Sequence, residues 1–461
     1  MNALDNIERV YFLGIGGIGM SALARYFSVT GKDVAGYDRT STELTRQLST
    51  EGIDIHYEDS PALIPPPFRS SQNTLVIYTP AIPADQTELC YFKENQFTLY
   101  KRSQILGLIT HLQKTVAVAG THGKTTVSTM IAHILTKAGP GCNAFLGGIS
   151  KNFNSNLVLH AKSDWVVTEA DEFDRSFLQL YPFAGLVTSM DPDHLDIYGD
   201  TGNLIEAFNE FIGQIDKKGL LLMKVGLPVN AEKLPSNVYT YSLNGPSDFR
   251  ADNIRLKNRK YHFDLIGPGI GLKDLSLEHP GLVNVENATA AVAMSLLLGL
   301  DPLLIRSALE DFSGIQRRFD YHVRTEDIVY IDDYAHHPKE IEATLSSTRE
   351  LYPDKKITGV FQPHLYTRTR DLAGGFAQSL NLLDRLILLD IYPAREVPIP
   401  GVTSEMIYKD VQIADKIMCS KENLLDVLKQ SRIEVLITMG AGDIDKFTGP
   451  IEQLLKERGK G

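Results

Sequence analysis

The fold is best predicted from one stretch of the sequence, Val116-Ala117-Val118-Ala119-Gly120-Thr121-His122-Gly123-Lys124-Thr125-Thr126. An apolar run typical of a buried strand enters Gly120, and a helical pattern follows over residues 125–137. Such a turn aims several backbone N–H groups at one point, where phosphate oxygens bind. Lys124 would neutralise phosphate charge, and the Thr125 hydroxyl would bind Mg²⁺. The loop is shorter than the usual pattern, but its place between strand and helix predicts phosphate binding by residues 120–126.

Polar side chains follow the next two strand-like runs. Glu169 opens an acidic segment directly after residues 165–168, and His194 lies in a second polar segment after residues 185–188. Ligands of open α/β sheets bind beyond the carboxyl ends of the strands, so Glu169 is placed to hold a metal ion and His194 a second metal or a phosphate. Taken alone, a solvated acidic loop and a structural histidine are the more ordinary interpretations. The oxygen-rich set favours Mg²⁺ over zinc, since no cysteine is near.

A second glycine loop lies near the N-terminus, where Gly14-Ile15-Gly16-Gly17-Ile18-Gly19 follows a short apolar run and precedes a helical pattern over residues 20–29. Asp38 stands 24 residues after Gly14, at the end of the next strand-like run. This is the fingerprint of a dinucleotide-binding turn. Gly14, Gly16, Gly17, Gly19 and Asp38 therefore predict a diphosphate site. NAD and a UDP-sugar both remain open as its ligand.

Alternating strand and helix patterns divide the chain into three α/β blocks. We expect a Rossmann-like domain over residues 1–112, a central P-loop ATPase-like α/β domain over 113–318, and a Rossmann-like domain over 319–461. Residues 236–277 are richer in short strands, and Asp301 should cap a helix that begins at Pro302.

Composition narrows the class of protein. The 461 residues are 43% hydrophobic and 22% charged, as in ordinary globular proteins, and the net charge of −11 argues against a general nucleic-acid binder. The 3 cysteines are widely spaced, which favours a reducing compartment such as the cytoplasm. We find neither a signal-peptide pattern nor an apolar run of about 18 residues, and therefore expect no membrane span.

Eight motifs taken together resemble the Mur ligase family of cell-wall synthesis, and they cover nearly the whole chain. They are GIGGIGM (14–20), AGTHGKTT (119–126), EADEFDRSF (169–177), DPDHLDIY (191–198), RRF (317–319), DDYAHHP (332–338), FQPHLYTRTR (361–370) and GAGD (440–443).

This resemblance implies that the first domain holds a UDP-sugar, that the second holds ATP and Mg²⁺, and that the third closes over the nucleotide and brings an amino acid. By motif match it implies metal ligands at Thr125, Glu169 and His194, and catalytic roles for Lys124, His194 and Arg318. The remaining implied contacts are Asn284 to adenine, Arg318, Asp333 and His336 to ATP, and His364, Arg368 and Arg370 to the amino acid or substrate.

The match is greatest to the members that join L-alanine to the lactyl carboxylate of UDP-N-acetylmuramate through an acyl-phosphate. Members that add later amino acids carry a lysine 14 positions after the motif histidine, and Phe208 stands there in this chain. Val283 and Leu365 depart from the family's usual pattern. A ligase that recycles cell-wall tripeptide, an NAD-dependent oxidoreductase and a non-catalytic nucleotide switch are the alternatives, and either a monomer or a dimer fits.

Overall fold

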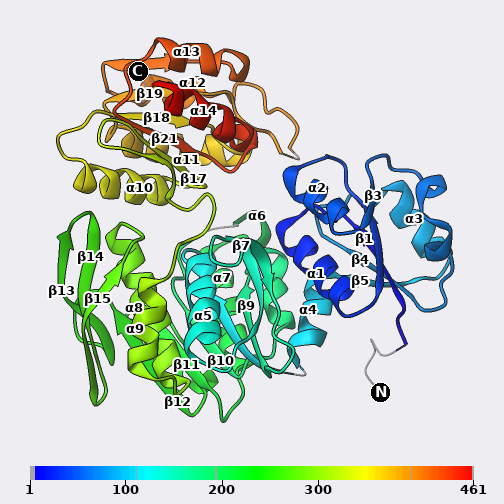
Figure 1. The fold of residues 1–461 in the computed structure, drawn as a ribbon. Helices are drawn as coiled ribbons and strands as arrows, with labels where there is room; N and C mark the ends of the chain where they lie inside the picture. Colours follow the sequence, from blue (N-terminus) through cyan, green and yellow to red (C-terminus); the bar gives the residue numbers. More distant parts are fainter. Residues whose placement is uncertain (1–5, 112, 193–194, 395, 459–461) are drawn as a thin grey trace. The chain divides into compact units, whose positions relative to one another are not determined.

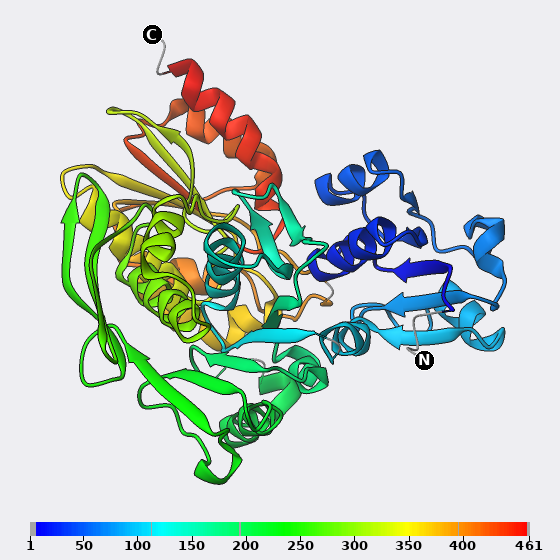
Figure 2. The ribbon, with the colours of Figure 1, turned by 60° about the horizontal axis from the view of Figure 1, so that its bottom comes forward.

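The computed structural model describes residues 6–111, 113–192, 195–394 and 396–458. The chain forms three α/β sheets, each from one continuous stretch of sequence, which Figure 1 shows as blue, cyan to green, and yellow to red, and which Figure 2 shows from a second direction. It divides into two compact units: residues 1–254, 262–276 and 286–313 form the first, and residues 255–261, 277–285 and 314–461 form the second. The predicted three-domain α/β class is confirmed.

The first sheet is entirely parallel and has the strand order β3-β2-β1-β4-β5. Its central strand is buried on both faces, as the apolar run over residues 10–13 predicts. The order reverses between β1 and β4, which is where such sheets bind ligands. Its elements are β1 (Arg9–Leu13), α1 (Ile18–Val29), β2 (Asp33–Tyr37), α2 (Glu43–Thr50), β3 (Asp54–His56), β4 (Thr74–Tyr78), α3 (Thr87–Glu94), β5 (Thr98–Lys101) and α4 (Arg102–His111).

The second sheet has the order β15-β14-β13-β12-β11-β10-β6-β9-β7-β8. β6 pairs in parallel with β9 and β10, which brings the carboxyl ends of these strands to one edge. The strands are β6 (Lys114–Ala119), β7 (Asn143–Ser150), β8 (Ser155–Val158), β9 (Trp165–Ala170), β10 (Ala184–Val187), β11 (Leu220–Lys224), β12 (Asn237–Ser242), β13 (Phe249–Lys257), β14 (Lys260–Gly267) and β15 (Ile270–Leu277). The short strands expected over residues 236–277 are therefore present.

The helices of this block are α5 (Lys124–Ala138), α6 (Leu195–Tyr198), α7 (Thr201–Gly213), α8 (Leu282–Leu297) and α9 (Pro302–Glu310), with a 3₁₀ segment η3 (Phe173–Gln179). The Asp301 carboxylate accepts hydrogen bonds from Leu303 N at 2.7 Å and Leu304 N at 3.2 Å, which confirms the predicted cap. Phe208 is fully buried and packs edge-on against Phe177, with ring centroids 5.3 Å apart.

The third sheet has the order β16-β17-β21-β18-β19-β20. It is parallel except at its edge, where β16 pairs antiparallel to β17, a departure from the purely parallel pattern expected. Its elements are β16 (Asp320–Arg324), β17 (Val329–Asp333), α10 (Pro338–Leu351), β18 (Ile357–Phe361), α11 (Tyr366–Leu380), β19 (Arg385–Leu388), α12 (Glu405–Asp410), β20 (Asp415–Met418), α13 (Leu424–Gln430), β21 (Val435–Met439) and α14 (Thr448–Arg458). Within the described residues of the whole chain, no helix has both the length and the apolar character needed to cross a membrane.

Candidate active site

The phosphate loop joins β6 to α5 as predicted, and its glycines meet strict steric demands. Gly120 has φ +135° and Gly123 has φ +81°, a region that side chains disfavour. A Cβ at Gly120 would lie 2.0 Å from Thr188 Oγ1, and one at Gly123 would lie 2.7 Å from Asn287 Oδ1. The backbone of this loop can therefore take its path only with glycine at both positions.

Residues that follow β10 form hydrogen bonds with the phosphate loop. Ser189 Oγ lies 2.9 Å from Thr121 Oγ1 and accepts a hydrogen bond of 2.9 Å from His122 N. Thr121 Oγ1 in turn accepts from Asp191 N at 3.1 Å, and Thr126 is buried in the first turn of α5. Sequence analysis missed Thr188 and Ser189, although their place directly after a strand could have indicated them.

Lys124 is held by a carboxylate that sequence analysis also missed. Its Nζ donates to Gly120 O at 2.8 Å and to the two carboxylate oxygens of Glu172 at 3.0 and 2.8 Å. Glu172 is fully buried, unlike a residue of a solvated acidic loop. Burial lowers the pKa of Lys124, but the charges of Glu172 and Asp171 outweigh it and raise that pKa to about 12. Lys124 is therefore a permanent cation beside the loop.

Glu169 and Thr125 form an oxygen pair next to the loop. Gly147 N of β7 donates to Glu169 Oε1 at 2.8 Å, and Thr125 hydrogen-bonds the same carboxylate. Burial raises the pKa of Glu169, while Lys124 opposes that shift. A Cβ at Gly147 would lie 2.3 Å from Glu169 Oε1, so this strand position admits the carboxylate because it is glycine. A hydroxyl and a carboxylate are the donors that Mg²⁺ prefers.

The second expected metal ligand, His194, lies outside the described residues. Across the part of the chain that is described, no group of three or more His, Cys, Asp or Glu side chains is arranged to hold a metal ion. The structure thus brings together Thr125 and Glu169, two of the three expected ligands.

The N-terminal glycine loop joins β1 to α1, and Asp38 closes it. Asp38 Oδ2 accepts a hydrogen bond of 2.8 Å from Gly16 N. Gly14 has φ +84°, and a Cβ there would lie 2.8 Å from Thr79 Cγ2. A Cβ at Gly19 would lie 2.7 Å from Arg102 Nη1, so the guanidinium crosses the first turn of α1. Gly17 has more room, since a Cβ there would meet its nearest atom at 3.6 Å.

Arg102 and α1 connect the first loop to the central sheet within the same unit. Arg102 begins α4, directly after β5, and its Nη2 lies 3.7 Å from Asp171 Oδ2. On the other side of α1, the buried Asn156 of β8 donates to Ile18 O at 2.5 Å and to Ser21 Oγ at 3.0 Å. Arg25 of α1 donates to Asn156 Oδ1 at 2.6 Å. The helix that follows the first glycine loop is therefore packed against the β7–β8 hairpin.

The second unit brings together Arg318, Asp333 and His336. Asp333 is buried at the end of β17 and accepts hydrogen bonds of 2.8 Å from both Phe319 N and Ala335 N. Burial, opposed by Arg318, raises the pKa of Asp333 to about 6. Arg318 lies over the Tyr334 ring, 5.2 Å from its centroid, and burial lowers the pKa of His336.

Of the remaining expected residues, His364 and Arg368 lie near His336, whereas Arg370 and Asn284 make other contacts. The His364 ring lies 6.1 Å from that of His336, and Arg368 is close enough to His336 to lower its pKa. Arg370 is exposed and pairs with its neighbour Asp371, away from this group. Asn284, in the first turn of α8, is buried and donates to Pro280 O at 2.7 Å.

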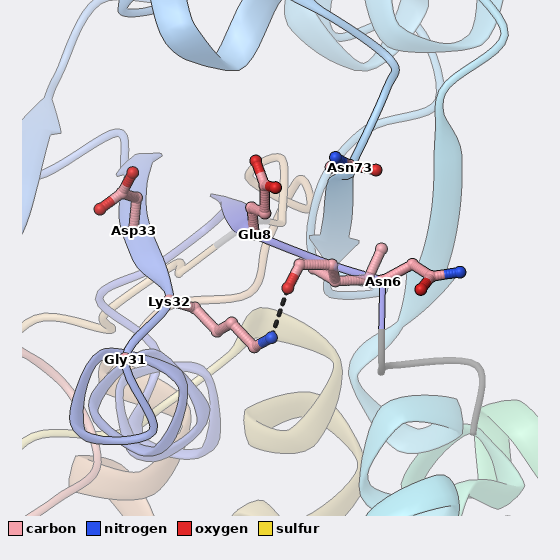
Figure 3. Close-up of a pocket in the computed structure, with 7 residues that line it drawn as sticks. Asn6, Glu8, Gly31, Lys32, Asp33 and Asn73 are labelled. Carbon is pink, nitrogen blue, oxygen red and sulfur yellow. Dashed lines mark hydrogen bonds between the residues drawn. The ribbon is translucent and has the colours of Figure 1, made fainter. Parts of the chain in front are cut away.

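One open hollow of about 590 Å³ lies away from these groups. Figure 3 shows its lining, with Glu8, Lys32, Asp33 and Asn73 around the amino ends of β1, β2 and β4, and with Lys32 donating to the carbonyl of Ile7. Nucleotides bind such sheets at the opposite, carboxyl edge. We therefore do not assign the hollow to the active site.

Comparison with known proteins agrees with this geometry. Three family models match the chain: the Mur ligase family catalytic domain over residues 9–114, the Mur ligase middle domain over 118–295, and the Mur ligase glutamate ligase domain over 317–442. The fold, the phosphate loop and these matches define the class, which is that of an ATP-dependent ligase. More particularly, the chain belongs to the Mur ligase family.

Its similar relatives span the full chain. It is 51% identical to a UDP-N-acetylmuramate–L-alanine ligase of Parabacteroides distasonis, with 98% of each chain covered, and 46% identical to one of Cytophaga hutchinsonii, with 99% and 98% covered. Among solved structures, a UDP-N-acetylmuramate-alanine ligase of Thermotoga maritima has a TM-score of 0.83 at 28% identity, covering 98% and 99%. A murein peptide ligase of Psychrobacter arcticus has a TM-score of 0.70 at 22% identity, covering 97% and 98%, and shares the fold.

Proposed function

We propose that this chain joins L-alanine to the lactyl carboxylate of UDP-N-acetylmuramate through an acyl-phosphate, releasing ADP and phosphate. The observation that carries the proposal is Lys124, which is held as a cation beside an oxygen pair in a phosphate loop. The relatives of about half identical sequence supply the substrate pair. The reaction belongs to peptidoglycan precursor synthesis, and its nucleotide substrates point to the cytoplasm.

The phosphate loop would bind ATP. Backbone N–H groups of residues 120–126 would face the phosphates, and Lys124 would neutralise the charge that develops as the terminal phosphoryl group leaves. Thr125 and Glu169 would hold Mg²⁺, which neutralises phosphate oxygens when bound. We propose the same role for His194 from its motif alone.

The first glycine loop would bind the diphosphate of the UDP-sugar. Asp38 already accepts from Gly16 N, whereas Gly17 has more open space, since a Cβ there would meet nothing closer than 3.6 Å, so a ligand would approach the backbone at Gly17 and at the first turn of α1. Helix N-termini favour anions, and the Arg102 guanidinium crosses this turn.

In the proposed reaction, ATP converts the substrate carboxylate, a poor acyl donor, into a reactive acyl-phosphate. A carboxylate would have to expel oxide, so its oxygen is first phosphorylated by ATP, which leaves ADP. The neutral amine of L-alanine then attacks the acyl carbon, and a tetrahedral intermediate collapses with loss of phosphate and a proton. Exclusion of water protects the acyl-phosphate from hydrolysis.

We further propose three functional domains, with boundaries at residues 1–112, 113–318 and 319–461. The third would bring Arg318, Asp333 and His336 to ATP and His364, Arg368 and Arg370 to the amino acid or substrate, with Asn284 at adenine. Buried hydrogen bonds orient Asp333, which fits a side chain that must meet a ligand in one geometry.

One assay separates the alternatives. Phosphate release would be measured with ATP and UDP-N-acetylmuramate and, in turn, L-alanine, glycine, L-serine and cell-wall tripeptide. We expect the highest kcat/KM with L-alanine. Preference for the tripeptide would identify the recycling ligase, and tight NAD binding without phosphate release would support the oxidoreductase. ATP binding with no turnover for any amine would support a nucleotide switch.

A further inference from the structure

Glu172 is a buried carboxylate to which the family motifs assign no role, and its geometry toward Lys124 is specific. An ammonium group has three N–H donors. In this structure Lys124 Nζ has three acceptors, namely Gly120 O at 2.8 Å and the Glu172 oxygens at 3.0 and 2.8 Å. The lysine is therefore saturated by protein groups before any phosphate arrives.

The position of Glu172 is fixed by its own backbone. Tyr198 Oη donates to Glu172 O at 2.6 Å, and both residues are buried. Asp174 and Arg175, two and three residues further on, both have φ +53°, so the chain turns sharply just after Glu172. Glu172 thus cannot follow Lys124 far if the lysine moves.

We propose that Glu172 is a positioning residue that holds Lys124 in the phosphate loop and gives it up to the terminal phosphates when ATP binds. The inference rests on the proposed function, because it assumes that Lys124 serves ATP. A carboxylate and a phosphate compete for the same cation, so Glu172 weakens ATP binding. It also keeps Lys124 extended along the loop in one orientation, so its loss slows turnover.

The same exchange acts after the reaction. When the terminal phosphoryl group has left ATP, Lys124 loses that partner and returns to Glu172. The carboxylate thereby favours release of ADP. Since a buried lysine without a partner is costly, the exchange also keeps Lys124 paired at every stage.

Glu172→Gln tests the proposal, because it keeps the shape of the side chain and removes its charge. We expect the Kd for ATP and for ADP, measured by calorimetry, to fall about fivefold, equivalent to about 1 kcal/mol. We expect kcat for phosphate release to fall at the same time. If Glu172 had only a structural role, Glu172→Gln would instead weaken nucleotide binding and lower the melting temperature.

Asp174→Asn is the matched control, since it removes one negative charge from the same segment. Asp174 pairs with Lys101 Nζ at 3.2 Å. Its Kd values should stay within twofold of the wild type. If Glu172→Gln folds poorly, Glu172→Asp keeps the charge but withdraws it by one methylene, and we expect lower kcat with nearly unchanged affinity.

Unchanged or weaker ATP binding in Glu172→Gln, or an equal gain in Asp174→Asn, overturns the proposal. These results are distinct from failure of the proposed function. A wild type that binds ATP but releases no phosphate with UDP-N-acetylmuramate and L-alanine contradicts that function, and the calorimetric comparison of the variants still decides the role of Glu172.

Discussion

The two glycine-rich loops of the first unit lie at the carboxyl ends of parallel strands, but they obtain their charges differently. In the N-terminal loop, the Asp38 carboxylate binds Gly16 N, and the cation is Arg102 from a helix elsewhere in the sequence. In the central loop, the cation is Lys124 of the loop itself, and the buried Glu172 pairs with it. The difference is consistent with the proposed function, in which the first loop only binds a diphosphate and the lysine of the second follows a phosphoryl group during transfer.

The largest effect should come from removing the central cation. We expect Lys124→Ala to lower phosphate release by about 10³-fold, since an electrostatic donor to the transition state is lost. UDP-sugar binding, measured by calorimetry, should remain. Lys137→Ala on the same helix is the control, because that lysine pairs with Asp311 at 3.0 Å and lies at the other end of α5. Near-normal turnover in Lys124→Ala would show that the loop does not serve the reaction.

The next largest effect concerns the oxygen pair beside that loop. Glu169→Gln should raise the Mg²⁺ concentration needed for half-maximal activity by about tenfold, because one charged ligand is lost. Magnesium titrations of phosphate release measure the change. An unaltered titration curve would remove Glu169 from the set of metal ligands.

An effect of similar size, in the N-terminal loop, distinguishes glycines that the fold requires from glycines that ligand binding requires. A Cβ at Gly16 would lie 2.6 Å from Thr45 Cγ2, so Gly16→Ala disturbs the fold itself, whereas Gly17→Ala meets nothing closer than 3.6 Å. Gly17→Ala should therefore retain its melting temperature and ATP affinity but bind the UDP-sugar about tenfold more weakly. Unchanged UDP-sugar binding would mean that the diphosphate does not approach this backbone.

A separate prediction concerns the pH dependence of the stability of the sheet that carries the N-terminal loop. Tyr11 of β1 donates to the buried Glu88 at 2.7 Å and lies 2.7 Å from His56 Nε2. Burial raises the pKa of Glu88 to about 7, from an ordinary value of 4.5. The folded state therefore binds the Glu88 proton more tightly than the unfolded state does. The contribution of Glu88 to stability is fully present below pH 4.5 and is lost as pH rises through about 7.

Glu88→Gln mimics the protonated acid and should flatten this decline. Hydrogen exchange of the β1 amides at pH 5 and pH 8 measures it. The wild type should lose protection at the higher pH by up to roughly 3 kcal/mol, and the variant should not. Equal losses in both proteins would assign the pH dependence to a group other than Glu88.

Local sequence patterns were enough to predict both loops, because glycine spacing and strand–helix alternation are short-range properties. The pairing of Glu172 with Lys124 could not be predicted in this way. Residues 169–174 offer several acidic side chains, and which of them points to Lys124 depends on the turn at Asp174 and Arg175, where non-glycine residues adopt φ +53°. Arg102 was missed because only the packing of α4 near α1 brings it to Gly19. The antiparallel β16 likewise depends on pairing across the sheet edge.

The β7–β8 hairpin contacts residues beside both glycine-rich loops, since Gly147 N donates to Glu169 and Asn156 donates to Ile18 O and Ser21 Oγ at the start of α1. Under the proposed function, a substitution within either loop would change the affinity for one substrate, whereas a substitution in this hairpin would change the affinity for both.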